Sequence, residues 1–486
     1  MYFADYLIID KSVCKIYNTK SEVKVKEIKL MDYEYKRKNA FKEADEKQLK
    51  AMFDYAEDYK KFLFSSKTER GATATAKALA EKKGYKSYTF GDKIKAGDKL
   101  YFINRDKNIF LIRVGTNDIE KCGVKIMAAH VDSPRLDLKP NPVFEDGGLA
   151  FLKTHYYGGI KKYQWTTIPL ALHGVAVVPG GKIVNVCIGE DEGDPVFYIT
   201  DLLPHLAQKQ VTEPLGTAIK GENLNAILTS IPAKSEEEEK EAVKAAALKL
   251  LHDKYGIDEI DFQTSELCFV PAGKPRDVGL DRALISGYGH DDKVCAYPEM
   301  TALFECNSKD TIISVFADKE ETGSNGVTGM QSMVILDLLD CISNALGANP
   351  VLVRYHSKCV SADVTAAYDP AYADVYEKRN ASFINCGASL TKYHGARGKS
   401  STNDASAEMV GYLRDAFDKK GVIWQTGELG KIDIGGGGTV AMFIANLGID
   451  TCDMGVPVLS MHAPYEVISK ADLYSMHLAM VAFCEA

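Results

Sequence analysis

The sequence predicts an α/β protein that is interrupted by an inserted β-rich domain. Two observations predict this fold class. Segments with helical spacing alternate with short apolar strand-like runs in residues 44–135 and again in residues 276–486. Between them, residues 136–275 are rich in β-branched and aromatic residues broken by Gly-Gly and Pro-Gly turns. The remaining residues, 1–43, are an amino-terminal arm whose role the sequence does not indicate.

The first α/β segment is predicted to begin with two helices. Between Ala44 and Gly84, apolar residues recur at spacings of three and four, and the pattern ends at a glycine. Strands are expected next in KLYFINR, NIFLIRVG and VKIMAAH. In the arm before these elements, VKVKEIKL alternates apolar and charged residues, which is typical of a strand or an ordered arm.

The insertion and the second α/β segment follow the same logic. KSEEEEKEAVKAAALKLLHDKYG predicts a helix with acidic residues in its first turn, in preference to an acidic binding tail. After Ala283 we expect, in order, a helix in VCAYPEMTALFEC, a strand in TIISVFA, a helix in GMQSMVILDLLDCISNAL and a strand in PVLVRY.

Composition excludes several classes of protein. The 486 residues carry 59 Lys and Arg against 67 Asp and Glu, a net charge of −8, which argues against a nucleic-acid binder. No run reaches the roughly 18 apolar residues of a membrane span. The amino terminus has neither a basic region nor a cleavage site, so a cytoplasmic location is expected. Eleven cysteines without C-x-x-C spacing disfavour a zinc ribbon.

Polar side chains follow four of the strand-like runs. The runs are IMAAHVDSPRL, ALISGYGHDDKV, TIISVFADKEETGS and VSADVTAAYDP, and a fifth candidate segment is GVPVLSMHAPYE. Because ligand sites in open α/β sheets lie at the carboxyl ends of strands, these residues can converge. Histidines and carboxylates together suit Zn²⁺, Co²⁺ or Mn²⁺. The candidate residues are His130, Asp132, His290, Asp291, Asp292, Asp318, Glu320, Glu321, Asp363 and His462.

This set is large enough for two metal ions. A shared carboxylate can bridge ions roughly 3.5 to 4 Å apart, and a further carboxylate can act as base. Glu320 and Glu321 are adjacent, so that one can bind metal while the other contacts water. Asp132 is placed to orient His130. Taken singly, each motif also has a structural interpretation, such as a hydrogen-bonded histidine or a charge pair at a helix start.

Two glycine-containing segments resemble nucleotide loops but lack the required pattern. YHGARGKSS ends like a P-loop, yet Tyr393 stands where the first glycine is needed. The run Gly435 to Gly438, followed by Thr439, lacks G-x-G-x-x-G spacing and favours close approach of backbone to a ligand or metal shell. H-E-x-x-H and G-x-S-x-G are both absent.

The segments AAHVDSPRL, ADKEETGS, VSADV and LSMHAPYE, in this order around a β-rich insertion, resemble the aspartyl aminopeptidase family of dinuclear zinc aminopeptidases. The resemblance extends from about Ala44 to the carboxyl terminus, and TKYHGARGKS and YYGGIKKYQW suggest a bacterial branch. It implies an α/β/α metallopeptidase domain with a central mixed sheet and a dimerisation insertion. It also implies dimers that assemble into a tetrahedral dodecamer and act on short peptides.

The resemblance also implies roles at the metals, two divalent ions per chain, with zinc first and cobalt or manganese as alternatives. One ion would be bound by His130 and Asp363, the other by Glu321 and His462, and Asp291 would bridge both. Glu320 would be the general base, and Asp132 would orient His130.

On the substrate side, the resemblance implies four further residues. Gly438 and Thr439 would lie beside the substrate, and His205 of the insertion would reach a neighbouring subunit's site. Lys392 would contact an acidic amino-terminal side chain. TTIPL replaces the family's D-R-D-L stretch, so acidic and neutral preferences both stay open.

One departure lies beside the bridging aspartate. Where the family has R-L-D-N-L, this chain has Gly289 to Lys293, GHDDK, so that Asp292 takes the place of the asparagine. His290 becomes an alternative ligand.

The predicted function is therefore a metal-dependent aminopeptidase that releases single amino-terminal residues from short peptides. A dinuclear hydrolase of another amide, such as a deacylase or carboxypeptidase, would use the same metal ligands. A non-catalytic assembly or cargo protein is a third hypothesis. Against it stands Glu320, because a scaffold needs neither a base nor all five ligands.

Overall fold

The computed structural model describes residues 8–10, 13–15, 34–234 and 240–486. The chain divides into two units, residues 1–38 and 39–486. In the first unit, β1 (Ile8–Asp10) pairs antiparallel with β2 (Val13–Lys15), while VKVKEIKL lies outside the described residues. The second unit begins with α1 (Ala40–Glu43), where Ala40 packs against residues of two other helices. The second unit therefore includes residues 39–43 of the segment predicted as an arm.

A nine-stranded mixed sheet forms the centre of the second unit, as the sequence predicted. Four adjacent strands, β20, β16, β6 and β15, run parallel, and β5 and β18 flank them antiparallel. The strand order is β19-β18-β20-β16-β6-β15-β5-β4-β3. Their bounds are β3 (Lys86–Ser87), β4 (Lys99–Asn104), β5 (Asn108–Arg113), β6 (Lys125–His130), β15 (Ile312–Ala317), β16 (Lys358–Ala362), β18 (Ala388–Thr391), β19 (Trp424–Thr426) and β20 (Asp450–Gly455).

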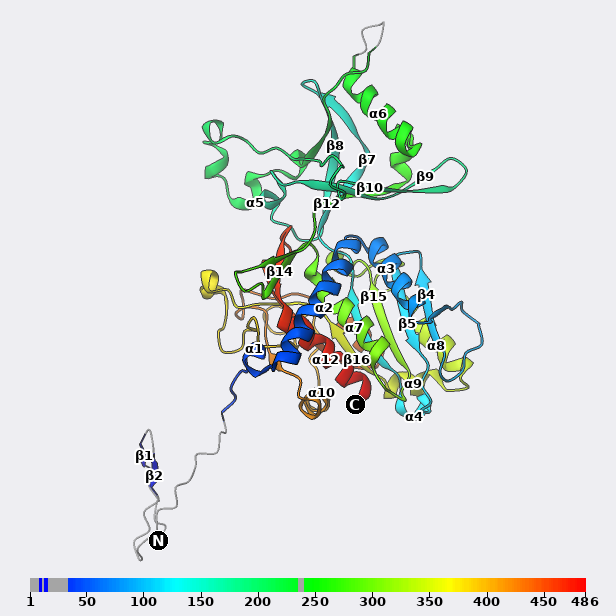
Figure 1. Cartoon of the computed structure of the whole chain (residues 1–486), viewed down its shortest axis with the longest axis vertical. Coiled ribbons are helices and arrows are strands. Elements are labelled where there is room, and N and C mark those ends of the chain that lie inside the picture. Colours follow the sequence, from blue (N-terminus) through cyan, green and yellow to red (C-terminus); the bar gives the residue numbers. More distant parts are fainter. Residues whose placement is uncertain (1–7, 11–12, 16–33, 235–239) are drawn as a thin grey trace, which may run out of the picture. The chain divides into compact units, whose positions relative to one another are not determined.

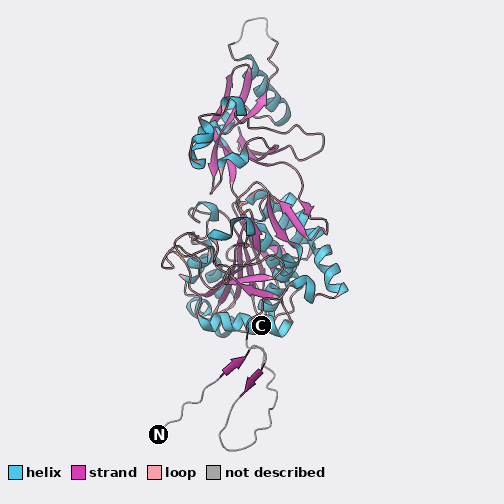
Figure 2. Cartoon of the chain, turned by 90° about the vertical axis from the view of Figure 1, so that its left-hand side faces the viewer, coloured by secondary structure: helices cyan, strands magenta, loops and turns pink. Residues whose placement is uncertain are grey.

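Helices cover both faces of this sheet, because alternate residues of its central strands are apolar on either side. In β6, Met127 and Ala129 belong to the core under α2, α7 and α12, whereas Ile126 and Ala128 belong to the core under α8, α9 and α11. Figure 1 shows α2, α7 and α12 gathered together, and Figure 2 shows helices on both sides of the strands. The bounds are α2 (Glu46–Ser65), α3 (Glu69–Lys82), α4 (Ile119–Cys122), α7 (His290–Glu305), α8 (Val334–Ala345), α9 (Pro350–His356), α10 (Ala407–Lys420), α11 (Ala441–Ala445) and α12 (Lys470–Glu485).

The two predicted amino-terminal helices are α2 and α3, and side chains mark where each begins. Asp45 forms a capping box with Gln48 at the start of α2, and Thr68 accepts a hydrogen bond from the Gly71 backbone N–H at the start of α3.

The strand predicted in PVLVRY is wrong, because this segment is helix α9. Asn349 accepts a hydrogen bond from the Val351 backbone N–H, and Pro350 occupies the first helical position, where its missing N–H costs nothing. The strand begins only after His356, as β16. A short apolar run does not distinguish strand from helix, and the cap at Asn349 was the signal that decided it.

The inserted segment forms a separate six-stranded antiparallel sheet with its own apolar core. The strand order is β10-β9-β12-β7-β8-β11. The bounds are β7 (Arg135–Asp146), β8 (Leu149–Tyr157), β9 (Leu170–Val178), β10 (Lys182–Ile188), β11 (Asn225–Thr229) and β12 (Ser265–Pro271), with helices α5 (Leu215–Ala218) and α6 (Ala242–Tyr255).

The acidic first turn predicted for α6 is not observed. The helix starts at Ala242 and has no acidic residue in its first turn, and glutamates 236–239 lie outside the described residues. Instead, the Glu145 carboxylate of β7 accepts hydrogen bonds from the Val243 and Lys244 backbone N–H groups, both at 2.9 Å. A carboxylate from another element thus occupies the helix start.

A third, five-stranded sheet lies in the same unit. Its order is β13-β14-β22-β21-β17, and β21 and β22 flank the loop that carries His462. The bounds are β13 (Arg276–Val278), β14 (Leu284–Gly287), β17 (Thr365–Ala366), β21 (Pro457–Leu459) and β22 (Glu466–Ser469).

Among the described helices, no single one has both the length and the apolar composition of a membrane span. The pair α8 and α9 meets the criterion jointly, although the two are bent by 113° from each other.

A buried ion-pair cluster joins the inserted sheet to the α2–α3 turn. Lys67 donates to both oxygens of Glu190, at 2.6 and 2.8 Å, and to the Pro271 carbonyl at 2.7 Å. The His173 ring nitrogen lies 2.7 Å from the same Glu190 carboxylate. Burial alone would raise the pKa of Glu190, but His173 and Lys67 outweigh it, and the pKa is lowered.

Glu190→Gln is expected to lower the free energy of unfolding by about 3 to 5 kcal/mol, because it leaves the buried Lys67 cation without its counter-ion. Since the folded-state pKa of Glu190 lies below its usual value of 4.5, this contribution is present above that pH and is lost as the pH falls further. Urea unfolding at pH 7 and at acidic pH measures both effects. The exposed Glu192→Gln is the control, and equal stability of the two variants would contradict the prediction.

Candidate active site

Three of the candidate segments meet at one edge of the central sheet. His130 is the last residue of β6, Glu320 and Glu321 follow β15 in a short 3-10 turn, and Asp363 follows β16. Because β6, β15 and β16 are adjacent and parallel, their carboxyl ends place these side chains together.

Glycine at position 455 permits β20 to lie close to the end of β16, where Asp363 follows. A Cβ atom there would lie 1.6 Å from the Asp363 carbonyl oxygen, so β20 and the end of β16 could not pair as closely with any other residue.

The other two ligand candidates come from outside the central sheet. Asp291 lies in the first turn of α7, and His462 lies in the loop between β21 and β22. Both reach the same cluster, which we call the ligand cluster: His130, Asp291, Glu321, Asp363 and His462.

The Asp291 carboxylate is the centre of the ligand cluster. His130 Nε2 lies 3.0 Å from Asp291 Oδ1, and His462 Nε2 lies 3.3 Å from Asp291 Oδ2. Asp363 Oδ1 is 3.9 Å from His130 Nε2, and Glu321 Oε1 is 3.7 Å from His462 Nε2. Each oxygen of one carboxylate therefore faces a different histidine, and each histidine has a further carboxylate beside it.

These donors fit divalent cations. In two groups, His130 with Asp292 and Asp363, and His130 with Asp291 and Glu321, the potential ligand atoms all lie within 4.8 Å of one another. Among the described residues, Glu321 Oε1 and both Asp292 carboxylate oxygens are buried without a hydrogen-bond partner. Buried carboxylate oxygens without partners are costly unless a cation satisfies them, and nitrogen and oxygen donors suit Zn²⁺.

The structure separates the two residues that flank Asp291. The His290 Nδ1 lies 2.8 Å from the Tyr59 hydroxyl, and burial lowers the pKa of His290 to about 3. Its partner is therefore a core tyrosine. Asp292, in contrast, presents carboxylate oxygens near His130 and Asp363 and is the stronger additional ligand candidate.

Asp132 connects His130 to the turn that carries the two glutamates. Its two carboxylate oxygens accept hydrogen bonds from the Glu320 and Glu321 backbone N–H groups, each at 3.2 Å. The His130 Nδ1 lies 3.1 Å from the Asp132 carbonyl oxygen and 3.4 Å from Oδ1. This leaves the His130 Nε2 directed at the ligand cluster, as expected of a residue that orients a metal-binding histidine.

Comparison with known proteins identifies the family. A model of the family described as Aminopeptidase I zinc metalloprotease (M18) matches residues 62–484 of the chain. The chain belongs to the M18 family of zinc aminopeptidases. This confirms the family expected from the sequence, and the chain is accordingly a peptide-bond hydrolase of the aminopeptidase class.

Bacterial M18 proteins are similar to this chain over almost its whole length. A probable M18 family aminopeptidase 1 of Clostridium acetobutylicum is 47% identical over 455 residues, covering 92% of this chain and 97% of the relative. The crystal structure of an M18 aminopeptidase from Thermotoga maritima has a TM-score of 0.89 at 42% identity, covering 93% and 100% of the two chains. A Saccharomyces cerevisiae aminopeptidase dodecamer, at 18% identity and a TM-score of 0.72 with 88% and 96% covered, shares the fold.

Glu466 is a site residue of this M18 protein that the sequence analysis missed. Its Oε1 accepts from the His462 backbone N–H at 2.7 Å, and its Oε2 accepts from the Asp291 backbone N–H at 3.0 Å. Burial, followed by the Asp291 charge, raises the pKa of Glu466 to about 8. It ties two ligand-bearing loops together. Its place four residues after His462 in HAPYE was the available signal.

The substrate-side candidates are less closely grouped than the metal ligands. The half-exposed Lys392 lies 3.9 Å from Asp404 and lines a cavity of about 210 Å³ with Leu390, Tyr393 and Glu428. His205 is exposed on a 3-10 turn (Pro204–Leu206) of the insertion.

The glycine run packs against another loop of this M18 protein. The Gly395 backbone N–H donates to the Gly437 carbonyl, and a Cβ at Gly436 would lie 2.5 Å from the Ala396 Cα. Thr439 is buried beside the Asp453 carboxyl group, while Gly438 has open space on its Cβ side. The close backbone approach that the structure shows is to residues 395–396, whereas an approach to a ligand or metal shell stays a prediction.

Proposed function

We propose that this M18 aminopeptidase binds two divalent ions in the ligand cluster and uses Glu320 as its general base to release single amino-terminal residues from short peptides. The observation that carries the proposal is the Asp291 carboxylate, whose oxygens face His130 and His462 separately. Asp291 would thus be the ligand shared by both ions. His130 and Asp363 would hold one ion, and Glu321 and His462 the other. Asp292 is a further candidate beside His130.

The bound ions would supply an activated water and polarise the peptide carbonyl. The chain's own residues would handle the proton. Burial raises the pKa of Glu320 to about 7, and positive charge in the ligand cluster would favour its ionised form, which accepts a proton from water. Glu320 would then return that proton to the leaving amine. Asp132, which accepts a hydrogen bond from the Glu320 backbone N–H, would keep Glu320 in place during both proton transfers.

Metal analysis combined with an activity panel tests the proposal. Purified protein would be assayed on Asp-, Glu-, Leu-, Ala- and Lys-arylamides before chelation, after chelation, and after Zn²⁺, Co²⁺ or Mn²⁺ is restored. About two ions per chain with chelator-sensitive release are expected. Two bound ions without release of any amino-terminal residue would favour hydrolysis of another amide. Failure to bind metal under every supplement would remove the proposed mechanism.

Lys392→Ala is expected to lower kcat/KM for Asp and Glu substrates about 10- to 100-fold relative to Ala and Leu substrates, because a charge-assisted contact to a carboxylate contributes about 1.5 to 3 kcal/mol. The measurement is kcat/KM over the same panel. Lys399→Ala is a matched control, since Lys399 also contacts Asp404, at 2.9 Å, from the adjacent loop. An equal loss on all substrates would dismiss Lys392 as the specificity residue.

Assembly and location are further parts of the proposal. The yeast dodecamer shares this fold, and by analogy we place this chain in a homo-oligomer built from dimers, with a tetrahedral dodecamer as the complete form and His205 contributing to a neighbouring site. Gly438 and Thr439 would line the substrate. A cytoplasmic location stays the prediction from the amino-terminal sequence. Light scattering of the purified protein measures the assembly, and a stable monomer would contradict it.

A further inference from the structure

Three consecutive residues of the insertion, Tyr157 to Gly159, contact the ligand cluster and its support. Tyr157 ends β8, and its hydroxyl donates to Asp132 Oδ2 at 2.8 Å. The Gly159 carbonyl lies 2.9 Å from His462 Nδ1. Between them, Gly158 lies against Glu321. The insertion therefore contacts the ligand cluster through these residues, although its sheet is separate from the central sheet.

Two of these contacts act on how the histidines present their metal-binding nitrogens. When His462 Nδ1–H donates to the Gly159 carbonyl, the Nε2 lone pair is left free toward Asp291. On the other side, Tyr157 supplies the one side-chain donor to Asp132 among the described residues other than the His130 ring. Asp132 in turn holds the Glu320 and Glu321 backbone.

The glycines allow this approach. Gly158 has a φ of +74°, and a Cβ there would lie 3.1 Å from Glu321 Oε2 and 3.4 Å from the Pro134 Cα. A Cβ at Gly159 would lie 3.2 Å from His462 Nδ1. A side chain at either position would press on a ligand residue.

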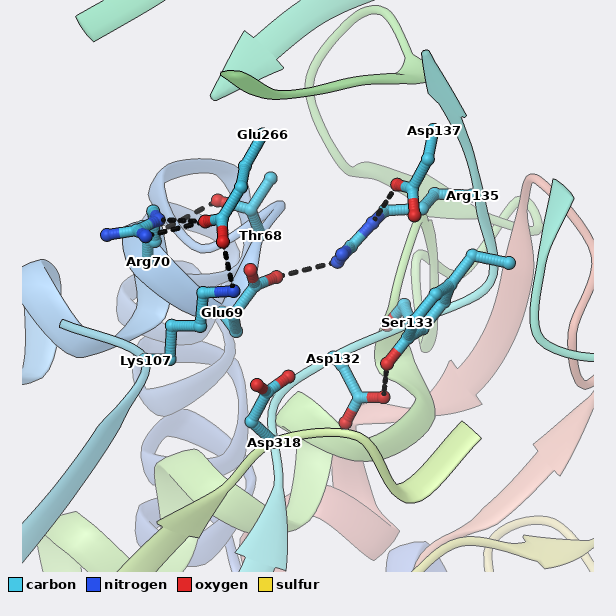
Figure 3. A network of polar contacts seen from close by, with 12 residues as sticks. Thr68, Glu69, Arg70, Lys107, Asp132, Ser133, Arg135, Asp137, Glu266 and Asp318 are labelled. Carbon is cyan, nitrogen blue, oxygen red and sulfur yellow. Dashed lines mark hydrogen bonds and ion pairs between the residues drawn. The ribbon is translucent and has the colours of Figure 1, made fainter. Parts of the chain in front are cut away.

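A cluster of charged side chains packs against the Tyr157 ring. The Arg135 guanidinium lies over the Tyr157 ring, 4.3 Å from its centroid, and donates to Glu69 at 2.6 Å and Asp137 at 2.7 Å. Arg135 and Asp137 belong to β7 and Glu69 to α3, so this cluster joins the inserted sheet to helix α3 beside Asp132 (Figure 3). Glu266 of β12 extends the same joint through Arg70 and Lys107.

We infer that Tyr157 is a positioning residue of the metal centre, which acts through Asp132 on His130 and on the turn carrying Glu320 and Glu321. The inserted domain thereby takes part in shaping the active site of its own chain. This inference rests on the proposed two-metal function, because the position of His130 matters only if it binds metal.

Tyr157→Phe tests the inference, because it removes the hydroxyl and keeps the ring under Arg135. We expect metal affinity, measured by competition with a chromophoric chelator, to fall about 10- to 100-fold. The visible spectrum of the Co²⁺-loaded protein should change, and kcat should fall while KM changes less than about twofold. The melting temperature of the apo form should stay close to that of the parent.

Tyr156→Phe is the matched control, since Tyr156 precedes Tyr157 on the same strand but is 43% exposed. It should match the parent in all three measurements. Asp132→Asn provides a second test: adding Tyr157→Phe to it should produce much less than the effect of Tyr157→Phe alone, whereas independent effects would multiply.

The outcomes separate the two proposals. If the parent protein binds metal and Tyr157→Phe behaves like Tyr156→Phe, the inference is wrong and the proposed function stands. If the two changes at Tyr157 and Asp132 multiply, Tyr157 does not act through Asp132. If the parent binds no metal, the proposed function itself fails.

Discussion

Glu320→Gln is expected to leave about two ions bound per chain while lowering kcat about 100-fold or more, since general acid-base catalysis contributes roughly 10² to 10⁴. Glutamine keeps the size of the side chain and leaves the backbone N–H bond to Asp132 in place. It cannot accept the proton of the attacking water at neutral pH. Metal content by elemental analysis and steady-state kinetics on the preferred arylamide measure the two effects separately.

The matched control for Glu320 is the same substitution at the exposed Glu192 in the insertion. That variant should retain the parent's kcat and metal content. Near-normal turnover of Glu320→Gln with both ions bound would show that another group takes the proton. Loss of metal in this variant would instead make Glu320 a ligand.

His462→Ala is expected to reduce bound metal below two ions per chain and to lower activity by more than about 100-fold. Removing a residue that only orients a ligand lowers activity by at most about 100-fold, and removing a ligand itself should lower it further. The ring nitrogen of His462 faces both Asp291, at 3.3 Å, and Glu321, at 3.7 Å. Its loss leaves Glu321 Oε1 and Asp291 Oδ2 without this histidine, while Asp291 Oδ1 keeps His130. Metal stoichiometry after gel filtration is the deciding measurement.

Two other histidine substitutions sharpen that result. His252→Ala is the surface control, because the exposed His252 pairs with the exposed Asp258 and, within the described part of the chain, with no other acidic side chain. His290→Asn removes the histidine that competed for the ligand role, and it should keep both ions while lowering stability, since the His290 ring is buried against Tyr59. Full metal occupancy in His462→Ala, or metal loss in His290→Asn, would reverse the assignment of the two histidines.

Local sequence patterns determined most of the secondary structure of the first α/β segment and part of that of the second. The spacing of apolar residues and the glycine at its end located α2 and α3, and apolar runs located β4, β5, β6 and β15. The strand predicted in PVLVRY was wrong because the apolar residues of so short a segment fit either a strand or a helix. In α9, Val351 and Leu352 lie on the exposed surface of the helix. A segment of six residues is too short for the spacing of its apolar residues to show which of them are buried.

The candidate ligands were identifiable because each belongs to a polar group that follows an apolar run or a glycine turn. Parallel pairing of β6, β15 and β16 explains why three of them meet, which the order of segments could suggest. Asp291 and His462 come instead from a helix start and a loop of a different sheet. Their convergence depends on how two sheets pack, and adjacent residues such as His290 and Asp291 point to different partners only in the folded chain.

The sequence by itself thus determined the fold class, the family resemblance and the residue types of a metal site, because these depend on local patterns. Only the tertiary structure decided which side chains support that site. Glu466 and Tyr157 act through single hydrogen bonds to the Asp291 loop and to Asp132, made between segments far apart in the chain. Such contacts leave no periodic trace, because one polar residue at one position is compatible with many neighbours until packing selects one.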